Sequence, residues 1–182
     1  AAGGAAAATP APAREEHTAA VSLDAVAHAS QPVEELLART RARGGTVVAT
    51  GGCFDLLHAG HVRMLRAARR LGDCLVVCLN SDASVRRLKG PGRPIVDQSA
   101  RVAVLEALES VDAVAVFGEA TPEAVLERLR PDVFAKGGDY AGVELPEAAV
   151  LRQWGGEVVV LPYEEGRSTS RLIAQAGGRN AA

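Results

Sequence analysis

Apolar and polar residues alternate along the chain in blocks whose period changes from that of strands to that of helices. Short runs of aliphatic and β-branched residues predict buried strands at 46–50, 74–80, 113–117, 132–137 and 157–162. Amphipathic or capped segments predict helices at 33–45, 60–72, 81–89, 98–110, 121–130, 145–156 and 168–178. Strands that alternate with helices predict an α/β domain with a doubly wound, Rossmann-like parallel sheet of five strands and helices on both faces.

Helix starts and faces can be assigned within this pattern. Ser81 is predicted to cap the helix over 81–89. Thr121 is predicted to cap the helix over 121–130, with Pro122 in its first turn. The apolar stripe predicted for the helix over 60–72 consists of Met64, Ala67, Ala68 and Leu71.

The composition divides the chain into a body and two tails. Residues 1–32 are rich in Ala, Pro and Gly and have few large apolar groups, which predicts a linker or disordered tail. Residues 33–176 form the predicted domain, and 177–182 a C-terminal tail. The alanine-rich start lacks the basic region and leucine-rich core of a signal peptide, so none is expected.

The net charge and the cysteine content indicate which binding partners and which cellular compartment to expect for the protein. The net charge of −2 argues against general nucleic-acid binding, and no stretch is long and apolar enough to predict a membrane span. Three cysteines, Cys53, Cys74 and Cys78, have no metal-ligand spacing. Cys74 and Cys78 are expected on the same buried face of one strand. Free thiols without a signal peptide favour the cytoplasm.

The segment "TGGCFDLLHAGH" carries the candidate chemistry. It leaves the first predicted strand and enters a helix, and Gly51 and Gly52 permit a sharp turn and close approach to a ligand. A helix start offers unpaired N–H groups and a positive dipole end, which suit a phosphate. His58 and His61 would add imidazole donors there, with Gly60 leaving room. A cap-region role satisfied by backbone groups is the alternative for these histidines.

This segment resembles the signature of the HxGH-type nucleotidyltransferases. The similarity extends over "NSDASVRRLKGPGRPI", "RVAVLEALESVDAV", "LRPDVFAKGGDY" and "GGEVVVLPYEEGRSTSRLI", and it covers about residues 33–174. Over this length the chain is similar to the adenylyltransferase domain of the bifunctional heptose-phosphate kinase/adenylyltransferases. The resemblance implies transfer of AMP from ATP to D-glycero-β-D-manno-heptose 1-phosphate, with release of pyrophosphate.

The resemblance also implies roles for individual residues. His58, His61 and Lys89 are the implied catalytic residues, which contact phosphates. Nucleotide binding is implied for Gly52, Cys53, Phe54, Gly60, Arg101, Gly137, Gly138, Asp139, Ser168 and Thr169. Substrate binding is expected of Asp55, Asn80 and Arg93, although the individual role of Asp55 stays open.

Several of these residues have plain structural alternatives. Lys89 could be a solvated helix-end lysine, Arg101 a helix-surface arginine and Asp139 a turn residue. Ser168 and Thr169 could be simple helix caps. The chain departs from the family pattern at Gly51 and Val96, where Asn is usual. The departure at Gly51 puts in doubt how the acceptor substrate is bound.

The predicted mechanism is direct in-line attack of the acceptor phosphate, because neither a Walker-type loop nor a nucleophile elbow is present in the sequence. Mg²⁺ is expected to arrive on the nucleotide phosphates, since no dedicated carboxylate cage is visible. Basic residues outnumber acidic ones over 63–93, which suits two phosphate-bearing substrates. A homodimer and a fused or separate sugar kinase stay open as partners.

Two alternatives to this function remain. One is a cytidylyltransferase that acts on glycerol 3-phosphate or another small phosphate. The other is a nucleotide-binding module without turnover, against which the intact His58 and His61 argue.

Overall fold

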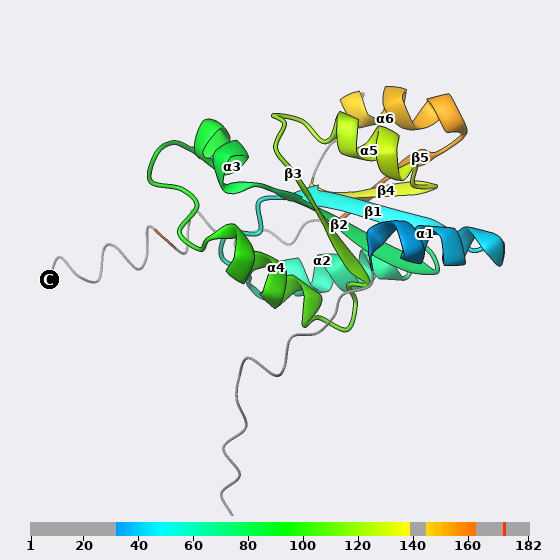
Figure 1. Cartoon of the computed structure of the whole chain (residues 1–182), viewed down its shortest axis with the longest axis horizontal. Helices are drawn as coiled ribbons and strands as arrows, with labels where there is room; N and C mark the ends of the chain where they lie inside the picture. Colours follow the sequence, from blue (N-terminus) through cyan, green and yellow to red (C-terminus); the bar gives the residue numbers. More distant parts are fainter. Residues whose placement is uncertain (1–31, 139–144, 163–172, 174–182) are drawn as a thin grey trace, which may run out of the picture.

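A computed structural model of the chain describes residues 32–138, 145–162 and 173. Within them, one parallel sheet has the strand order β3-β2-β1-β4-β5. The strands are β1 (Val47–Gly52), β2 (Cys74–Asn80), β3 (Ala113–Phe117), β4 (Val133–Gly137) and β5 (Glu157–Leu161). The predicted fold class is confirmed, and Figure 1 shows the strands as a central layer between helices.

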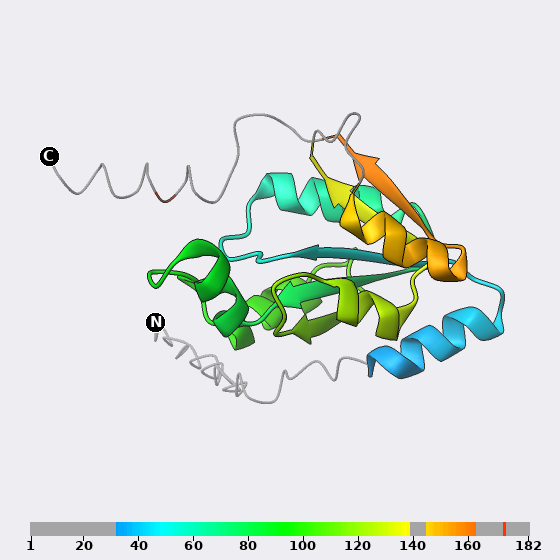
Figure 2. The same ribbon diagram turned by 90° about the horizontal axis from the view of Figure 1, so that it is seen from above.

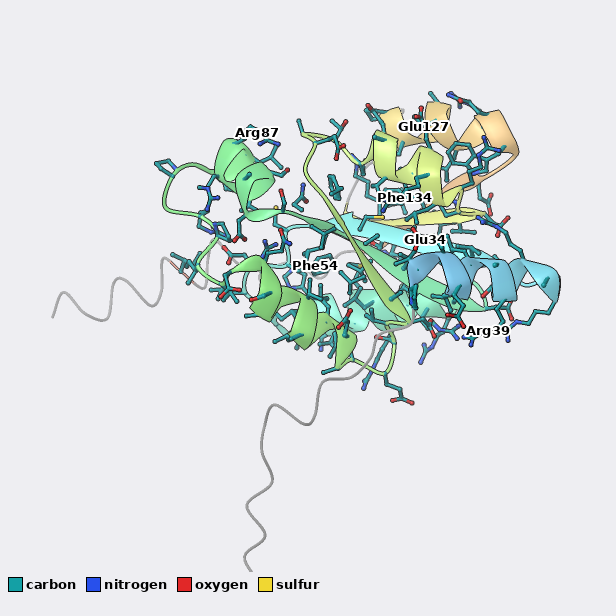
Figure 3. All side chains as sticks on the ribbon, in the orientation of Figure 1. Glu34, Arg39, Phe54, Arg87, Glu127 and Phe134 are labelled. Carbon is teal, nitrogen blue, oxygen red and sulfur yellow. The ribbon has the colours of Figure 1, made fainter. Side chains whose placement is uncertain are left out.

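Helices cover both faces of this sheet. They are α1 (Val33–Ala42), α2 (Ala59–Arg69), α3 (Asp82–Lys89), α4 (Gln98–Glu106), α5 (Glu123–Leu129) and α6 (Pro146–Leu151), followed by the 3₁₀ turn η2 (Arg152–Trp154). The core between the sheet and α1, α5 and α6 contains Phe134. The core between the sheet and α2 and α4 contains Phe54, and Figure 3 shows the two rings on opposite sides of the strands.

Three aspartates fix the amino ends of the central strands. Carboxylate oxygens of Asp132 and Asp73 accept hydrogen bonds of 2.7 Å from the N–H groups of Val47 and Thr46. Asp112 accepts one of 2.8 Å from the N–H of Leu75. These contacts satisfy backbone N–H donors at the amino ends of the strands, away from the "HAGH" segment. A ligand site is therefore expected at the opposite, carboxyl ends. Figure 2 shows α3 beyond that carboxyl end.

The predicted cap at Ser81 is confirmed, because its hydroxyl accepts a hydrogen bond of 3.2 Å from the N–H of Ser84. The predicted cap at Thr121 is wrong. Helix α5 begins after Pro122, and the Thr121 hydroxyl bonds the Glu123 carboxylate at 3.0 Å instead of a backbone N–H.

Other helix boundaries shift by local geometry. The helix expected over 98–110 ends at Glu106, because the following residues form tight turns in which the N–H of Leu108 bonds the carbonyl of Leu105. The predicted apolar stripe of α2 omitted Leu65, which is one of its two buried residues. The helix expected over 168–178, except Ile173, lies outside the described residues. So do both predicted tails, except Pro32, which precedes α1 as its N-cap.

Cys74 and Cys78 are buried in the core on the α1 side, as predicted. Burial raises the pKa of Cys78 to about 12, so this thiol is unreactive in the folded protein. None of the helices in the described part of the chain has the length and apolarity needed to cross a membrane.

Candidate active site

A cavity of about 460 Å³ opens at the carboxyl ends of β1, β4 and β5, beside the first turn of α2. The order β3-β2-β1-β4-β5 places the topological switch point between β1 and β4, where open α/β sheets bind ligands. The cavity wall includes Gly51 and Gly52 from β1, His58 and His61 from the start of α2, and Gly137 from β4. The structure therefore brings the "HAGH" segment together with the end of β4.

The two histidines form a stacked pair. Their ring centroids are 3.9 Å apart, and the ring planes differ by 29°. His58 is the N-cap of α2, and its Nδ1 accepts a hydrogen bond of 3.2 Å from the N–H of Gly60. Nδ1 therefore carries no proton, and the neutral ring of His58 holds its hydrogen on Nε2. One nitrogen of the ring thus caps the helix, and the opposite nitrogen carries the hydrogen.

His61 is kept neutral by its surroundings. Burial, with a smaller contribution from the neighbouring His58, lowers the pKa of His61 from 6.5 to about 4. Phe54 supplies part of that burial, with its ring centroid 5.3 Å from that of His61. The Nδ1 of His61 is buried and has no hydrogen-bond partner among the described residues. At neutral pH His61 therefore presents a neutral imidazole to the cavity.

The loop between β1 and α2 brings Phe54 into the core beneath this pair. Phe54 has a φ of 44°, a conformation that is uncommon for residues other than glycine, and its side chain is buried. A Cβ at Gly52 would lie 3.0 Å from the Phe54 ring, so the glycine permits the close packing of ring and strand. The predicted nucleotide-binding residues Gly52, Cys53, Phe54 and Gly60 all line the cavity.

Asp55 was expected to bind substrate, but the structure gives its carboxylate a different task. Its side chain is buried and accepts hydrogen bonds of 2.5 Å from Arg93 Nε, 2.8 Å from the N–H of Ile95 and 3.0 Å from the N–H of Val96. Burial raises the pKa of Asp55, but these hydrogen bonds outweigh it and hold the pKa below 3.8. Asp55 is thus a positioning residue that ties the 93–96 loop to the cavity wall.

Arg101 was expected to bind nucleotide, with a helix-surface arginine as the alternative; its burial rules out the surface alternative, and nucleotide binding stays a prediction. Its side chain is 1% exposed. Its guanidinium donates to the carbonyls of Cys53 (2.7 Å), Asn80 (2.8 Å) and Val96 (3.0 Å), and it pairs with Asp82 at 2.7 Å. Arg101 therefore joins the β1–α2 loop, the end of β2 and the start of α3 from behind the cavity.

Asn80 is also occupied by structural contacts. Its side chain is buried, and its Nδ2 donates to Ser84 Oγ at 3.0 Å. This hydrogen bond fixes the first turn of α3, and the expected contact of Asn80 with substrate stays a prediction. Arg93, the third expected substrate residue, pairs with Asp55, although part of its side chain stays exposed.

Lys89 lies at the last position of α3 and is exposed. It does not line the cavity, but its charge acts on Cys53, which does. Burial raises the pKa of Cys53, and the positive charges of Lys89, Arg101 and Arg93 partly offset that effect. Lys89 is thus close enough to influence the cavity electrostatically.

The structure also adds residues that the sequence interpretation missed. Lys136, one position before the expected Gly137, lines the cavity, as does Arg63, which follows His61 by two residues. Both residues could have been found from their position, because Lys136 is next to Gly137 and Arg63 lies two residues after the "HAGH" segment. Gly138 lies next to the cavity residue Gly137 and bonds the carbonyl of Leu161 at 3.3 Å. Asp139, Ser168 and Thr169 lie outside the described residues.

The lining has a chemical character that fits a phosphate-bearing ligand. Its charged side chains, among the described residues, are those of Arg63 and Lys136, beside the two imidazoles and the N-terminus of α2. No carboxylate lines the cavity within the described part of the chain. This donor set suits a magnesium ion that is bound by the ligand's own phosphates, and Mg²⁺ stays a prediction.

A Rossmann-like sheet with histidines at a helix start beside its switch point defines a nucleotidyltransferase-like α/β protein. The family model described as cytidylyltransferase-like matches residues 49–175, and the chain belongs to this family.

Curated relatives refine the likeness. The chain is 68% identical over 141 residues to the bifunctional protein HldE of Streptomyces coelicolor, and 48% identical over 141 residues to that of Trichlorobacter lovleyi. Each alignment covers 78% of this chain but only 30% and 29% of the relative. The chain thus spans less than a third of the length of these relatives.

Solved structures agree on the fold. A lipopolysaccharide core biosynthesis protein from Thermoplasma volcanium is 28% identical with a TM-score of 0.56, over 68% of this chain and all of that one. A pantoate-beta-alanine ligase from Francisella tularensis is 13% identical with a TM-score of 0.52, over 77% of this chain and 67% of that one. The second likeness concerns the fold alone.

Proposed function

We propose that this chain transfers AMP from ATP to a sugar 1-phosphate, D-glycero-β-D-manno-heptose 1-phosphate, to give an ADP-sugar and pyrophosphate. The observation that carries the proposal is the stacked pair of His58 and His61 at the start of α2, which lines a cavity without acidic side chains in its described lining. The similarity to proteins named HldE supports the choice of sugar and nucleotide.

The proposed reaction is a single in-line displacement. An oxygen of the acceptor phosphate forms a bond to the α-phosphorus of ATP while the bond from that phosphorus to the bridging oxygen breaks. Pyrophosphate leaves with the electron pair of the broken bond. Such a transfer needs positioning and charge stabilisation more than covalent help from the protein.

The chain's residues supply that stabilisation. The Nε2–H of His58 and the neutral ring of His61 offer donors whose protons are already placed, and the N–H groups at the start of α2 add their dipoles. Arg63 and Lys89 add positive charge near the phosphates. When bound, Mg²⁺ would neutralise part of the triphosphate charge, and the residues above act on the oxygens that it leaves free.

The test is pyrophosphate release measured with a nucleotide panel and an acceptor panel. ATP with heptose 1-phosphate is expected to give the highest kcat/KM. CTP and glycerol 3-phosphate are the alternative substrates with which it is compared. A preference for CTP with glycerol 3-phosphate would replace the proposal with the cytidylyltransferase alternative. Binding of nucleotide without turnover on any acceptor would indicate a non-catalytic module. Dimerisation, a sugar kinase partner and a cytoplasmic location stay predictions.

A further inference from the structure

Lysine is used very selectively in this chain. Of its 20 basic residues other than histidine, only Lys89 and Lys136 are lysine, and the other eighteen are arginine. Lys89 follows β2 at the end of α3, and Lys136 is the penultimate residue of β4. Helix α3 lies beyond the carboxyl ends of the strands (Figure 2), and Lys136 lines the cavity that opens at these ends. Lysine presents a compact ammonium that binds phosphate as a point charge, whereas arginine forms planar forks.

An ion pair anchors the Lys136 side chain in the cavity wall. Its side chain is 25% exposed, and its Nζ lies 2.8 Å from Oε1 of Glu147. Glu147 is the second residue of α6, and its side chain is only 9% exposed. The ion pair therefore joins β4 to α6 beside the cavity and fixes the direction of the ammonium group.

This ion pair is poorly explained as a stabilising contact alone. Removing a carboxylate from water is costly unless its oxygens find partners, and Oε2 of Glu147 is buried with no hydrogen-bond partner among the described residues. Helix α6 is already packed on the sheet by Leu151, which is fully buried. An apolar pair would serve that packing at lower cost, so the charge of Lys136 calls for another explanation.

We propose that Lys136, oriented by Glu147, binds a phosphate oxygen of a substrate from the β4 wall of the cavity. This inference rests on the proposed function, which brings two phosphate-bearing substrates into one cavity. His58 and His61 approach from the first turn of α2, whereas Lys136 approaches from β4. The bound phosphate belongs either to the nucleotide or to the acceptor, because both carry the same oxyanion chemistry. Glu147 is a positioning residue that acts through Lys136.

The first test observes the lysines directly. In protein labelled with ¹³C at lysine Cε, the chain contributes only two lysine signals, and Lys136→Arg assigns them. We expect the Lys136 signal to shift with an unreactive α,β-methylene analogue of ATP, with a sugar 1-phosphate, or with both, and not with adenosine. A Lys136 signal that stays in place at millimolar concentrations of both phosphate compounds would overturn the proposal.

The second test is kinetic and identifies the phosphate. Lys136→Met should raise the KM of one substrate about 10- to 100-fold, the range expected for a lost charge-assisted hydrogen bond. A rise for ATP assigns the contact to the nucleotide, and a rise for the sugar phosphate assigns it to the acceptor. Lys136→Arg, which keeps the positive charge but not the compact ammonium, should recover only part of the loss. Unchanged KM values for both substrates in Lys136→Met would contradict the inference.

Glu147→Gln separates positioning from simple stabilisation. It should raise the same KM by a smaller factor, and it should add nothing further in a protein that already carries Lys136→Met, because Glu147 acts through the lysine. Arg69→Met is the matched control, since it breaks an ion pair of the same 2.8 Å length with Asp112 at the amino ends of the strands. The control should lower the melting temperature without changing either KM.

The two proposals fail in different ways. Absence of nucleotidyl transfer together with a shifted Lys136 signal would reject the proposed function and keep the phosphate site. Normal turnover and normal KM values in Lys136→Met would keep the proposed function and reject the role of Lys136. A fall in melting temperature alone in both Lys136→Met and Glu147→Gln would reduce the pair to a structural contact and overturn the inference.

Discussion

The low pKa of His61 makes the stability of the fold depend on pH in a defined way. The unfolded chain binds a proton on His61 near pH 6.5, whereas the folded chain resists protonation until about pH 4. The unfolded state therefore gains protons first as the pH falls, and the free energy of unfolding must decrease between these two values. With these two pKa values, His61 alone lowers that free energy by about 2 kcal/mol between pH 7 and pH 5.

His61→Gln removes this dependence, because glutamine keeps a polar side chain that does not titrate. The assay is urea unfolding of both proteins at pH 7 and pH 5. We expect the wild type to lose about 2 kcal/mol more than His61→Gln over this interval. His28→Gln is the control, since this histidine in the N-terminal tail is predicted to be solvated, and it should behave like the wild type. Parallel losses in wild type and His61→Gln would show that the ring titrates normally and that the neutral stacked pair is wrong.

Four further predictions follow from the site. His58→Ala and His61→Ala should each lower kcat about 10²- to 10³-fold, because preorganised donors act mainly in the transition state. ATP affinity, measured by titration, should change less than about tenfold. A loss of stability with kcat preserved would mean that the histidines only cap the helix. Lys89→Ala should lower kcat/KM about tenfold or more with an unchanged melting temperature, since Lys89 is exposed; wild-type kinetics would make it a surface lysine. Asp55→Asn should reduce the free energy of unfolding by about 1.5–3 kcal/mol at pH 7. The difference from wild type should disappear at low pH, once the pH has fallen below 3.8 and then below the lower pKa of Asp55 in the folded protein. A difference that does not change with pH would refute the contact of an ionised Asp55. Cys53, the only cysteine of the three that is not buried, should react with a thiol reagent more slowly than a free thiol and more slowly again with ATP present; labelling that ATP does not slow would place the nucleotide elsewhere.

Local patterns predicted the strands and the position of the histidines, because both depend on neighbours in sequence. The apolar run over 74–80 forms β2 with its predicted bounds, and His58 caps α2 where a strand meets a helix. The capping prediction at Thr121 failed because a carboxylate two residues on competes for the hydroxyl. Lys136 was missed because the orientation of its side chain depends on Glu147 of another element. No local sequence pattern reveals such a contact.

Asp55 and Arg101 show that a charged residue of a motif can be bound by the protein itself. Both carry charge within or beside the segments that resemble a catalytic signature, and both are buried with their polar atoms bound to protein. Their contacts meet on one segment, since Asp55 accepts from the N–H of Val96 and Arg101 donates to its carbonyl. Together they hold the loop that follows α3 against the backbone of Cys53, which lines the cavity.

This arrangement changes how loss of activity at either position must be interpreted. Removing the Arg101 guanidinium would leave Asp82 and three carbonyls without that donor, at a cost to stability before any substrate binds. A loss of turnover in such a variant would therefore reflect a displaced cavity wall and would not show a direct contact with substrate. A contact with substrate is better sought among the residues that line the cavity, which include His58, His61, Arg63 and Lys136. The chemistry that we propose would draw on these residues and on the charge of Lys89, while Asp55 and Arg101 hold the loop behind the cavity wall.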